Sequence, residues 1–317
     1  MSINTVTQRE PRVWSPLGRV FKKIKKRWQL YLFVALPVAY FIIFHYIPFL
    51  GIVLAFKDYR VSLGILHSPW AGTKYFEQFF DLPFFWRLIR NTLILSGYTL
   101  LLSFPAPIIL ALCLNEIRMW RFKKIVQMVT YAPYLISTVV MVGMIFQFLS
   151  PRYGLVNIIT GALGIPSQDF MGNSSLFRSI YVLSDVWQTT GYAAVIYIAA
   201  LAGIDPSLHE AAKIDGASRF QSMRHIDFPC IRPTMIVLLV LNIGGLMNVG
   251  FEKVYLMQNP LNTSVSEVIQ TYVYKLGLVQ GDYSFATAVG LFNSLINLLL
   301  ILMANQMARR TSDSSLW

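Results

Sequence analysis

The sequence is poor in charged residues, cysteines and histidines, and these scarcities exclude several classes of protein. Only 13% of the 317 residues are charged and 55% are hydrophobic, which is not the composition of a soluble globular domain. The two cysteines, Cys113 and Cys230, form no disulfide or metal-binding pattern, and the four histidines are scattered without the spacing of metal ligands. We therefore expect neither a disulfide framework nor a metal site.

The sequence also lacks a glycine-rich phosphate-binding loop, so we expect that the chain does not hydrolyse ATP by itself. No constellation of residues predicts catalysis. No cleavable signal peptide is evident, because the basic cluster at residues 22–27 precedes an apolar run that is too long for a signal sequence. The chain is thus expected to be non-catalytic and to hold no cofactor of its own.

What the sequence does contain is six long apolar runs, each able to cross about 30 Å of hydrocarbon as a helix. They predict an all-α polytopic membrane protein with a membrane domain at residues 30–308, a tail at 1–29 and a second tail at 309–317. Aromatic residues between 57 and 88 indicate an amphipathic helix at the membrane interface. The expected spans are 30–56, 88–116, 125–149, 176–202, 234–257 and 285–308.

Basic residues are distributed unevenly between the segments that join these spans. The two tails, the loop 117–124 and the segment 203–233 hold 18 of the 27 Lys and Arg residues, whereas the segments of the opposite face hold 8. An excess of Lys and Arg marks the cytoplasmic side. We therefore expect both termini in the cytoplasm. We attribute the net charge of +12 to this topology and to contact with membrane lipid, not to binding of nucleic acid.

The segment 203–233 is the one long polar stretch between two strongly apolar ones, and it begins with the signals of a helix. Asp205 is expected to cap the helix, with Pro206 as its first residue because proline has a fixed φ and no N–H to leave unpaired. Gly216 is expected to end the helix, since glycine readily adopts the left-handed conformation. The segment therefore begins with one short helix and a glycine turn.

A second short helix is expected over residues 218–226, with Pro229 and Pro233 marking its end. Together the two helices resemble the EAA motif of ABC importer permeases, E-A-A-x3-G-x9-I-x-L-P, at every spacing. The one departure is Phe228, which stands where the family usually has leucine. The residues that carry the match are Glu210, Ala211, Ala212, Gly216, Ile226 and Pro229.

In that family the two short helices dock in a cleft of an ATPase subunit, and the resemblance implies the same role for these six residues and for Asp215. It also implies the type I importer permease fold, in which this segment is a cytoplasmic coupling loop. The implied partners are a second homologous permease, two copies of an ATPase that binds ATP and Mg²⁺, and an extracytoplasmic solute-binding protein.

Polar residues inside the membrane are costly and usually face a cavity or a partner. Two clusters in the expected fourth and fifth spans have the amide, carboxylate and aromatic groups that bind sugars, although such residues also hold membrane helices together. Asp185 is assigned less weight, as a residue near the outer interface. The expected substrate-pathway residues are Gln188, Thr189, Tyr192, Asn242, Gly245, Asn248 and Glu252.

Further runs narrow the resemblance to carbohydrate permeases of the maltose-permease type, in the branch that carries polysaccharide fragments, including alginate. These runs are YIAALAGI, NVGFEKVYLMQNP, VIQTYVYKLGL and YSFATAVGLFNSLINLLL. The resemblance implies import of oligosaccharides across a bacterial cytoplasmic membrane. The alternatives that stay open are an importer for glycerol phosphate or a peptide, a membrane scaffold for an ATPase, and a secondary transporter. An acidic sugar would find a partner in Lys253.

Overall fold

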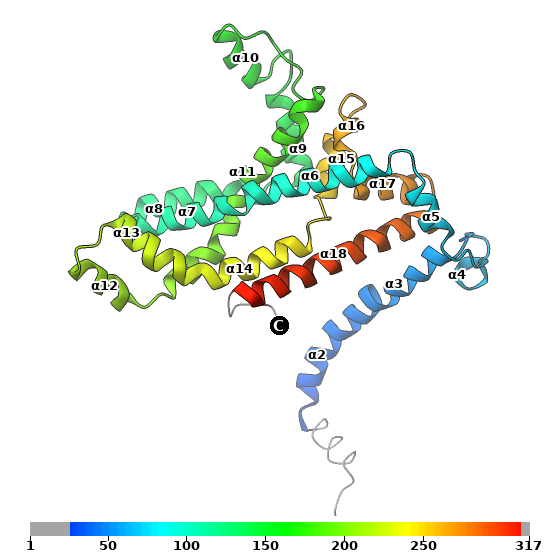
Figure 1. The fold of residues 1–317 in the computed structure, drawn as a ribbon, viewed down its shortest axis with the longest axis horizontal. Coiled ribbons are helices and arrows are strands. Elements are labelled where there is room, and N and C mark those ends of the chain that lie inside the picture. Colours follow the sequence, from blue (N-terminus) through cyan, green and yellow to red (C-terminus); the bar gives the residue numbers. More distant parts are fainter. Residues whose placement is uncertain (1–25, 312–317) are drawn as a thin grey trace, which may run out of the picture. The chain divides into compact units, whose positions relative to one another are not determined.

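The computed structural model describes residues 26–311, and every regular element in this range is a helix (Figure 1). The all-α class predicted from the sequence is confirmed. In the described range, four helices are long and apolar enough to cross a membrane, and there are six candidate spans if each of two bent pairs is one span. The four are Trp28–Phe56, Phe85–Glu116, Arg219–Gly244 and Tyr283–Arg310, and the bent pairs cover Trp120–Phe148 and Ser174–Ile214.

The chain divides into two compact units, and the residues up to Val53 belong to the first. This part follows one helical path in which a π-turn separates two α-helices. Pro48 lies just after the π-turn, which widens the helix where the proline ring would otherwise clash with the preceding turn. The elements are α2 (Trp28–Phe41), η1 (Ile42–Tyr46), α3 (Ile47–Phe49) and the 3-10 turn η2 (Leu50–Phe56), which continues into the second unit. The expected N-terminal tail lies largely outside the described residues.

In the second unit, the long helix α11 (Ser174–Ala202) is the element against which most others pack. Its neighbours are α6 (Phe85–Ser103), α7 (Pro105–Glu116), α8 (Trp120–Tyr131) and α14 (Phe228–Gly244). The last helix, α18 (Tyr283–Thr311), lies along α14 (Figure 1). Gly244 permits this close packing, because a Cβ atom there would lie 2.7 Å from the Cδ1 atom of Ile301.

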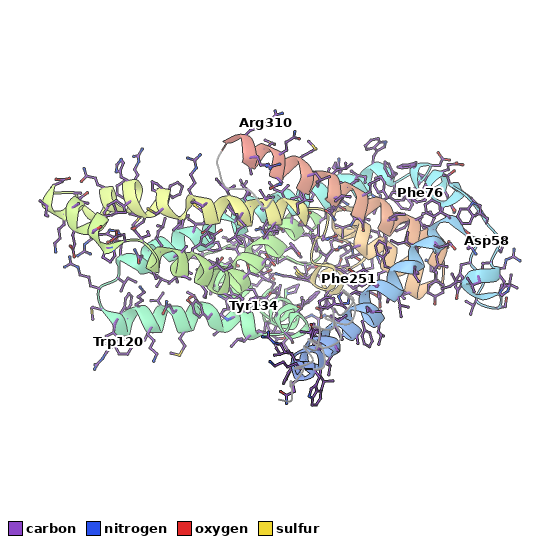
Figure 2. All side chains as sticks on the ribbon, turned by 90° about the horizontal axis from the view of Figure 1, so that it is seen from below. Asp58, Phe76, Trp120, Tyr134, Phe251 and Arg310 are labelled. Atoms are coloured by element: carbon purple, nitrogen blue, oxygen red, sulfur yellow. The ribbon has the colours of Figure 1, made fainter. Side chains whose placement is uncertain are left out.

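The expected third span is not one continuous helix. The run α8 and η3 (Ala132–Leu135), which extends from Trp120 to Tyr134 in Figure 2, meets α9 (Thr138–Phe148) at an angle of 101°. Ile136 is extended at the break, and the Ser137 hydroxyl accepts a hydrogen bond from the Val140 amide to start α9. A new helix cap therefore divides a run whose hydropathy alone predicts a single span.

The expected fifth span is displaced, and the expected end of the second coupling helix is wrong. Residues Arg219–Gly244 form one continuous helical run, composed of α13 (Arg219–Ser222), the π-turn η4 (Met223–Asp227) and α14. Pro229 and Pro233 do not end it, because Pro229 falls in the first turn after the π-turn, where its missing N–H is tolerated. After Gly244 the chain is non-helical until α15 (Phe251–Met257).

Short helices fill the segments between the long ones. The segment 57–88 is not the single amphipathic helix that the sequence suggests: it holds two short helices, and some of its aromatic residues are buried whereas Trp70, Phe80 and Trp86 are exposed. Phe79 is fully buried, with its ring 5.0 Å from that of Phe85 and 5.3 Å from that of Phe292 on α18. The short elements are α4 (Gly64–His67), α5 (Lys74–Phe80), α10 (Leu155–Ala162), α16 (Thr263–Ser266), α17 (Ile269–Tyr274) and the π-turn η5 (Lys275–Val279).

Candidate functional site

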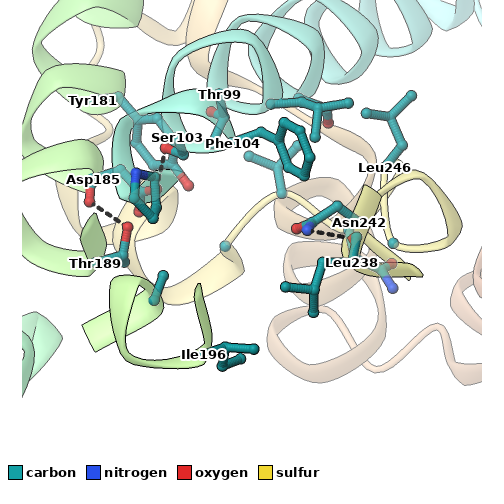
Figure 3. Close-up of a pocket in the computed structure, with 18 of the residues that line it drawn as sticks. Thr99, Ser103, Phe104, Tyr181, Asp185, Thr189, Ile196, Leu238, Asn242 and Leu246 are labelled. Atoms are coloured by element: carbon teal, nitrogen blue, oxygen red, sulfur yellow. Dashed lines mark hydrogen bonds between the residues drawn. The ribbon is translucent and has the colours of Figure 1, made fainter. Parts of the chain in front are cut away.

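A cavity of about 470 Å³ lies between α6, α11, α14 and the non-helical residues that follow α14 (Figure 3). Its polar lining consists of hydroxyls, amides and one carboxylate, and its apolar lining includes Leu246 and Val249. No Lys or Arg side chain is among the described residues that line it. The polar lining residues other than tyrosines are Ser96, Thr99, Ser103, Asp185, Thr189, Asn242 and Asn248.

The wall formed by α6 was not predicted from the sequence. Ser96, Thr99 and Ser103 are separated by three and four residues, so they lie on one face of the helix. The Thr99 hydroxyl donates to the Leu95 carbonyl at 2.8 Å, whereas the Ser96 hydroxyl is buried and has no hydrogen-bond partner among residues 26–311. This helical spacing of small polar residues within an apolar span was the signal that could have identified the wall.

Asp185 also lines the cavity, although the sequence suggested a position near the outer interface. Its carboxylate accepts a hydrogen bond from the Ser103 hydroxyl at 3.3 Å, which joins α11 to α6. Its other oxygen lies 3.5 Å from the Nζ atom of Lys253, whose side chain is only 6% exposed and lies over the Tyr181 ring. The Asp185 carboxylate thus lines the cavity, and the buried Lys253 ammonium group, which does not line it, balances the negative charge.

Three of the seven expected pathway residues lie outside the lining of this cavity. The Gln188 amide donates to the Ile136 carbonyl at 3.1 Å, so it holds α11 to the break before α9. The Tyr192 ring stacks on the Tyr134 ring at 4.0 Å with an interplanar angle of 4°. Glu252 is exposed in the first turn of α15. The structure gives Gln188 and Tyr192 packing contacts, and their proposed role in the pathway stays a prediction.

The other four expected pathway residues, Thr189, Asn242, Gly245 and Asn248, do line the cavity. The Asn242 amide nitrogen donates to the Leu238 carbonyl at 2.8 Å, which leaves its side-chain oxygen as an acceptor. Asn248 is held differently, because its side-chain oxygen accepts from three amide groups. These donors are Gln270 and Asn293 at 3.0 Å and Asn297 at 3.2 Å. The Asn248 side chain therefore fixes the non-helical turn as well as lining the cavity.

We expect Asn242→Leu to weaken transport while the complex still assembles, because it removes an acceptor from the cavity wall, and the hydrogen bond of its amide nitrogen lies within α14. Loss of one hydrogen bond to a neutral sugar hydroxyl is worth about 0.5–1.5 kcal/mol, or roughly 2- to 10-fold in apparent affinity. Uptake of labelled substrate measures the effect. Leu241→Ala, at the neighbouring position of α14 that is exposed and does not line the cavity, is the control and is expected to transport normally. Normal uptake by the Asn242 variant would contradict a role in substrate binding.

The coupling segment has the local structure that the sequence predicts at its first helix, α12 (Pro206–Ile214). The Asp205 carboxylate accepts the Ser207 amide hydrogen at 2.9 Å. This bond, with one from the Ser207 hydroxyl, holds the pKa of Asp205 below its ordinary value. Gly216 has a φ of 75°, which confirms the left-handed end of the helix. The next helix starts at a capping box between Ser218 and Gln221.

The residues assigned to ATPase coupling form an accessible surface on this segment. Five of the seven are exposed, whereas Ala212 and Ile226 are half-buried. Two large apolar residues that the sequence reasoning did not assign, Ile214 and Phe220, are 86% and 67% exposed beside them. An apolar side chain on an otherwise polar helix was the signal that could have identified both. The seven are Glu210, Ala211, Ala212, Asp215, Gly216, Ile226 and Pro229.

Comparison with known proteins identifies relatives along nearly the whole chain. The family model for the "binding-protein-dependent transport system inner membrane component" matches residues 103–313. Protein LplB of Bacillus subtilis (strain 168) is 44% identical over 92% of this chain and 92% of its own length. The polygalacturonan/rhamnogalacturonan transport system permease protein YteP of the same strain is 42% identical over 94% of this chain and 93% of its own.

The fold has a close counterpart among solved structures. A chain of a bacterial alginate ABC transporter, solved in complex with an alginate pentasaccharide-bound periplasmic protein, superposes with a TM-score of 0.86. The two chains are 39% identical, and the match covers 94% of this chain and 100% of the other. The permease fold expected from the coupling motif is therefore confirmed.

Proposed function

Because the chain belongs to the family of binding-protein-dependent transport system inner membrane components, we propose that it is the permease subunit of an ATP-driven oligosaccharide importer. The observation that carries the proposal is the cavity between α6, α11 and α14, lined by hydroxyls, amides and the Asp185 carboxylate. Such groups exchange hydrogen bonds with sugar hydroxyls. Relatives named for polygalacturonan and alginate support fragments of a polysaccharide as the substrate.

The rival solutes find less support in the cavity. A phosphate ester requires basic groups or a helix N-terminus at its binding site, and no Lys or Arg lines the cavity in the described part of the chain. A uronate carboxylate would meet Lys253 only after Asp185 had moved, since the Nζ atom is buried behind that carboxylate. The acidic group of such a substrate would therefore bind elsewhere in the pathway, while its hydroxyls face Asp185.

The proposed assembly contains this chain, a second homologous permease, two copies of an ATPase and an extracytoplasmic solute-binding protein. The alginate transporter that was solved with its periplasmic protein supports the last of these. The exposed coupling segment would dock on the ATPase, which alone would bind ATP and Mg²⁺. This chain would be non-catalytic. The experiment that tests the proposal is uptake of tetragalacturonate and maltotetraose by the reconstituted complex, and uptake of neither would contradict it.

We propose that both termini and the coupling segment lie on the cytoplasmic side of a bacterial cytoplasmic membrane, because basic residues are concentrated there. The test is labelling with a membrane-impermeant thiol reagent after replacing Cys113 and Cys230 by alanine. A cysteine at Leu163, which is 75% exposed in the segment before α11, is expected to react from outside, and a cysteine at Ser218 is not. The reverse pattern would overturn this topology.

A further inference from the structure

We propose that His209 and Asp227 form a joint through which the coupling helix α12 moves the membrane helix α14. The joint rests on the proposed function, because it matters only if α12 docks on an ATPase. The His209 Nε2 atom lies 3.3 Å from an Asp227 carboxylate oxygen, and its Nδ1 atom lies 3.1 Å from the Ser222 hydroxyl. One imidazole ring thus connects α12 to two points on the run that continues into α14.

The π-turn at Met223–Asp227 makes this double contact possible. Ser222 and Asp227 are five residues apart, and in a regular α-helix of 3.6 residues per turn they would face directions about 140° apart. A π-turn takes more residues per turn, so it brings residues at this spacing closer to one face. The π-turn therefore lets one His209 ring contact both Ser222 and Asp227.

The Asp227 carboxylate depends on this contact. It is 0% exposed, and neither of its oxygens receives a well-aligned hydrogen bond in the described part of the chain. The His209 ring approaches it to 3.3 Å, and the Asn115 side chain of α7 also approaches it. A buried carboxylate without a partner is strongly unfavourable, so loss of the His209 contact would destabilise this part of the fold. The contact holds the His209 side chain where α7 and α14 meet.

The rest of α12 is held only weakly. None of its residues is buried, and the chain around it turns at Gly203 and again at the left-handed Gly216. The His209 side chain is therefore the fixed point between these two turns. When an ATPase displaces α12, a force at this point reaches the first turn of α14, which carries the cavity residue Asn242 further along.

The experiment compares His209→Ala with His225→Ala in the complete complex with its ATPase and binding protein. His225 is the matched control, because it lies in the same segment and its hydrogen bond, among the residues described, is to the Gln221 carbonyl of its own helical run, at 2.9 Å. We expect His209→Ala to keep the ATPase during purification and to keep basal ATP hydrolysis. Stimulation by binding protein with tetragalacturonate should fall about tenfold, a coupling loss of ordinary size. His209→Gln, which keeps a donor for Asp227, should recover most of the stimulation.

Equal stimulation of the His209→Ala and His225→Ala complexes would overturn the joint. Asp227→Asn provides a second measurement, because this buried residue has no surface to offer an ATPase. It should keep the bound ATPase and show reduced stimulation, and loss of the ATPase by both variants would also overturn the proposal. If the wild-type complex is stimulated by neither tetragalacturonate nor maltotetraose, the proposed function fails, and that outcome is distinct from failure of the joint.

Discussion

The variant Lys253→Met is expected to lose most of its transport activity and much of its stability. The substitution leaves the Asp185 carboxylate, which is 22% exposed, without the ammonium group that lies 3.5 Å away. Removing one partner of a buried ion pair costs about 3–5 kcal/mol, because the remaining charge is left uncompensated. The measurements are thermal unfolding of the purified complex and substrate uptake.

Arg60→Met is the control, since this arginine is also paired, with Asp58 at 3.4 Å, but the two side chains are 63% and 38% exposed. A more exposed pair of this kind is worth about 1 kcal/mol or less. The double variant Lys253→Met/Asp185→Asn should recover most of the lost stability but not the transport, because Asp185 also lines the cavity. A Lys253 variant as stable and active as the Arg60 variant would contradict the importance of the pair.

The variant Gly216→Val is expected to abolish substrate-stimulated ATP hydrolysis while the permease itself still folds. The left-handed φ of 75° at this position is unfavourable for valine by about 1–2 kcal/mol. In the described part of the chain, a Cβ atom there would meet no atom within 4 Å. The turn between the two coupling helices would instead change shape, and the surface around Glu210 would no longer fit its partner.

Gly164→Val is the control for backbone strain alone. Gly164 has a φ of 79°, also has open space around its Cα, and lies in the loop after α10. It should lose similar stability and keep stimulation. The readouts are co-purification of the ATPase and hydrolysis with and without binding protein and substrate. If both glycine variants respond as the wild type does, the segment is not the coupling element.

The local structure of the coupling segment could be predicted because its signals are local. A capping aspartate, a proline at the first helical position and a glycine that needs positive φ act over four or five residues. The far end of the segment could not be predicted in the same way. Pro229 and Pro233 usually interrupt helices, but here a π-turn before them and the packing of Ile231 keep the run continuous.

For the membrane spans too, features set by nearby residues could be predicted, whereas features set by contacts between distant segments could not. Hydropathy finds the apolar runs but does not show where a run bends or stops, because Ser137 and Asn248 act through caps and amide contacts that have no hydropathy signal. The cavity was anticipated in part, from polar residues on α11 and α14. Its third wall on α6 and the pairing of Asp185 with Lys253 depend on which helix faces meet, and this is decided by packing between distant segments.

The π-turn between the coupling helix α13 and α14 also determines which changes this part of the chain can accept over evolutionary time. Successive residues of an α-helix are rotated by about 100°, so the number of residues in the run fixes the direction in which each end faces. Adding or deleting one residue between Ser218 and Gly244 would turn the docking surface away from the cavity wall, even if every remaining side chain were unchanged. Exposed side chains of this run that lie outside the docking surface are free to diverge among relatives, whereas differences in length belong in loops such as residues 150–173.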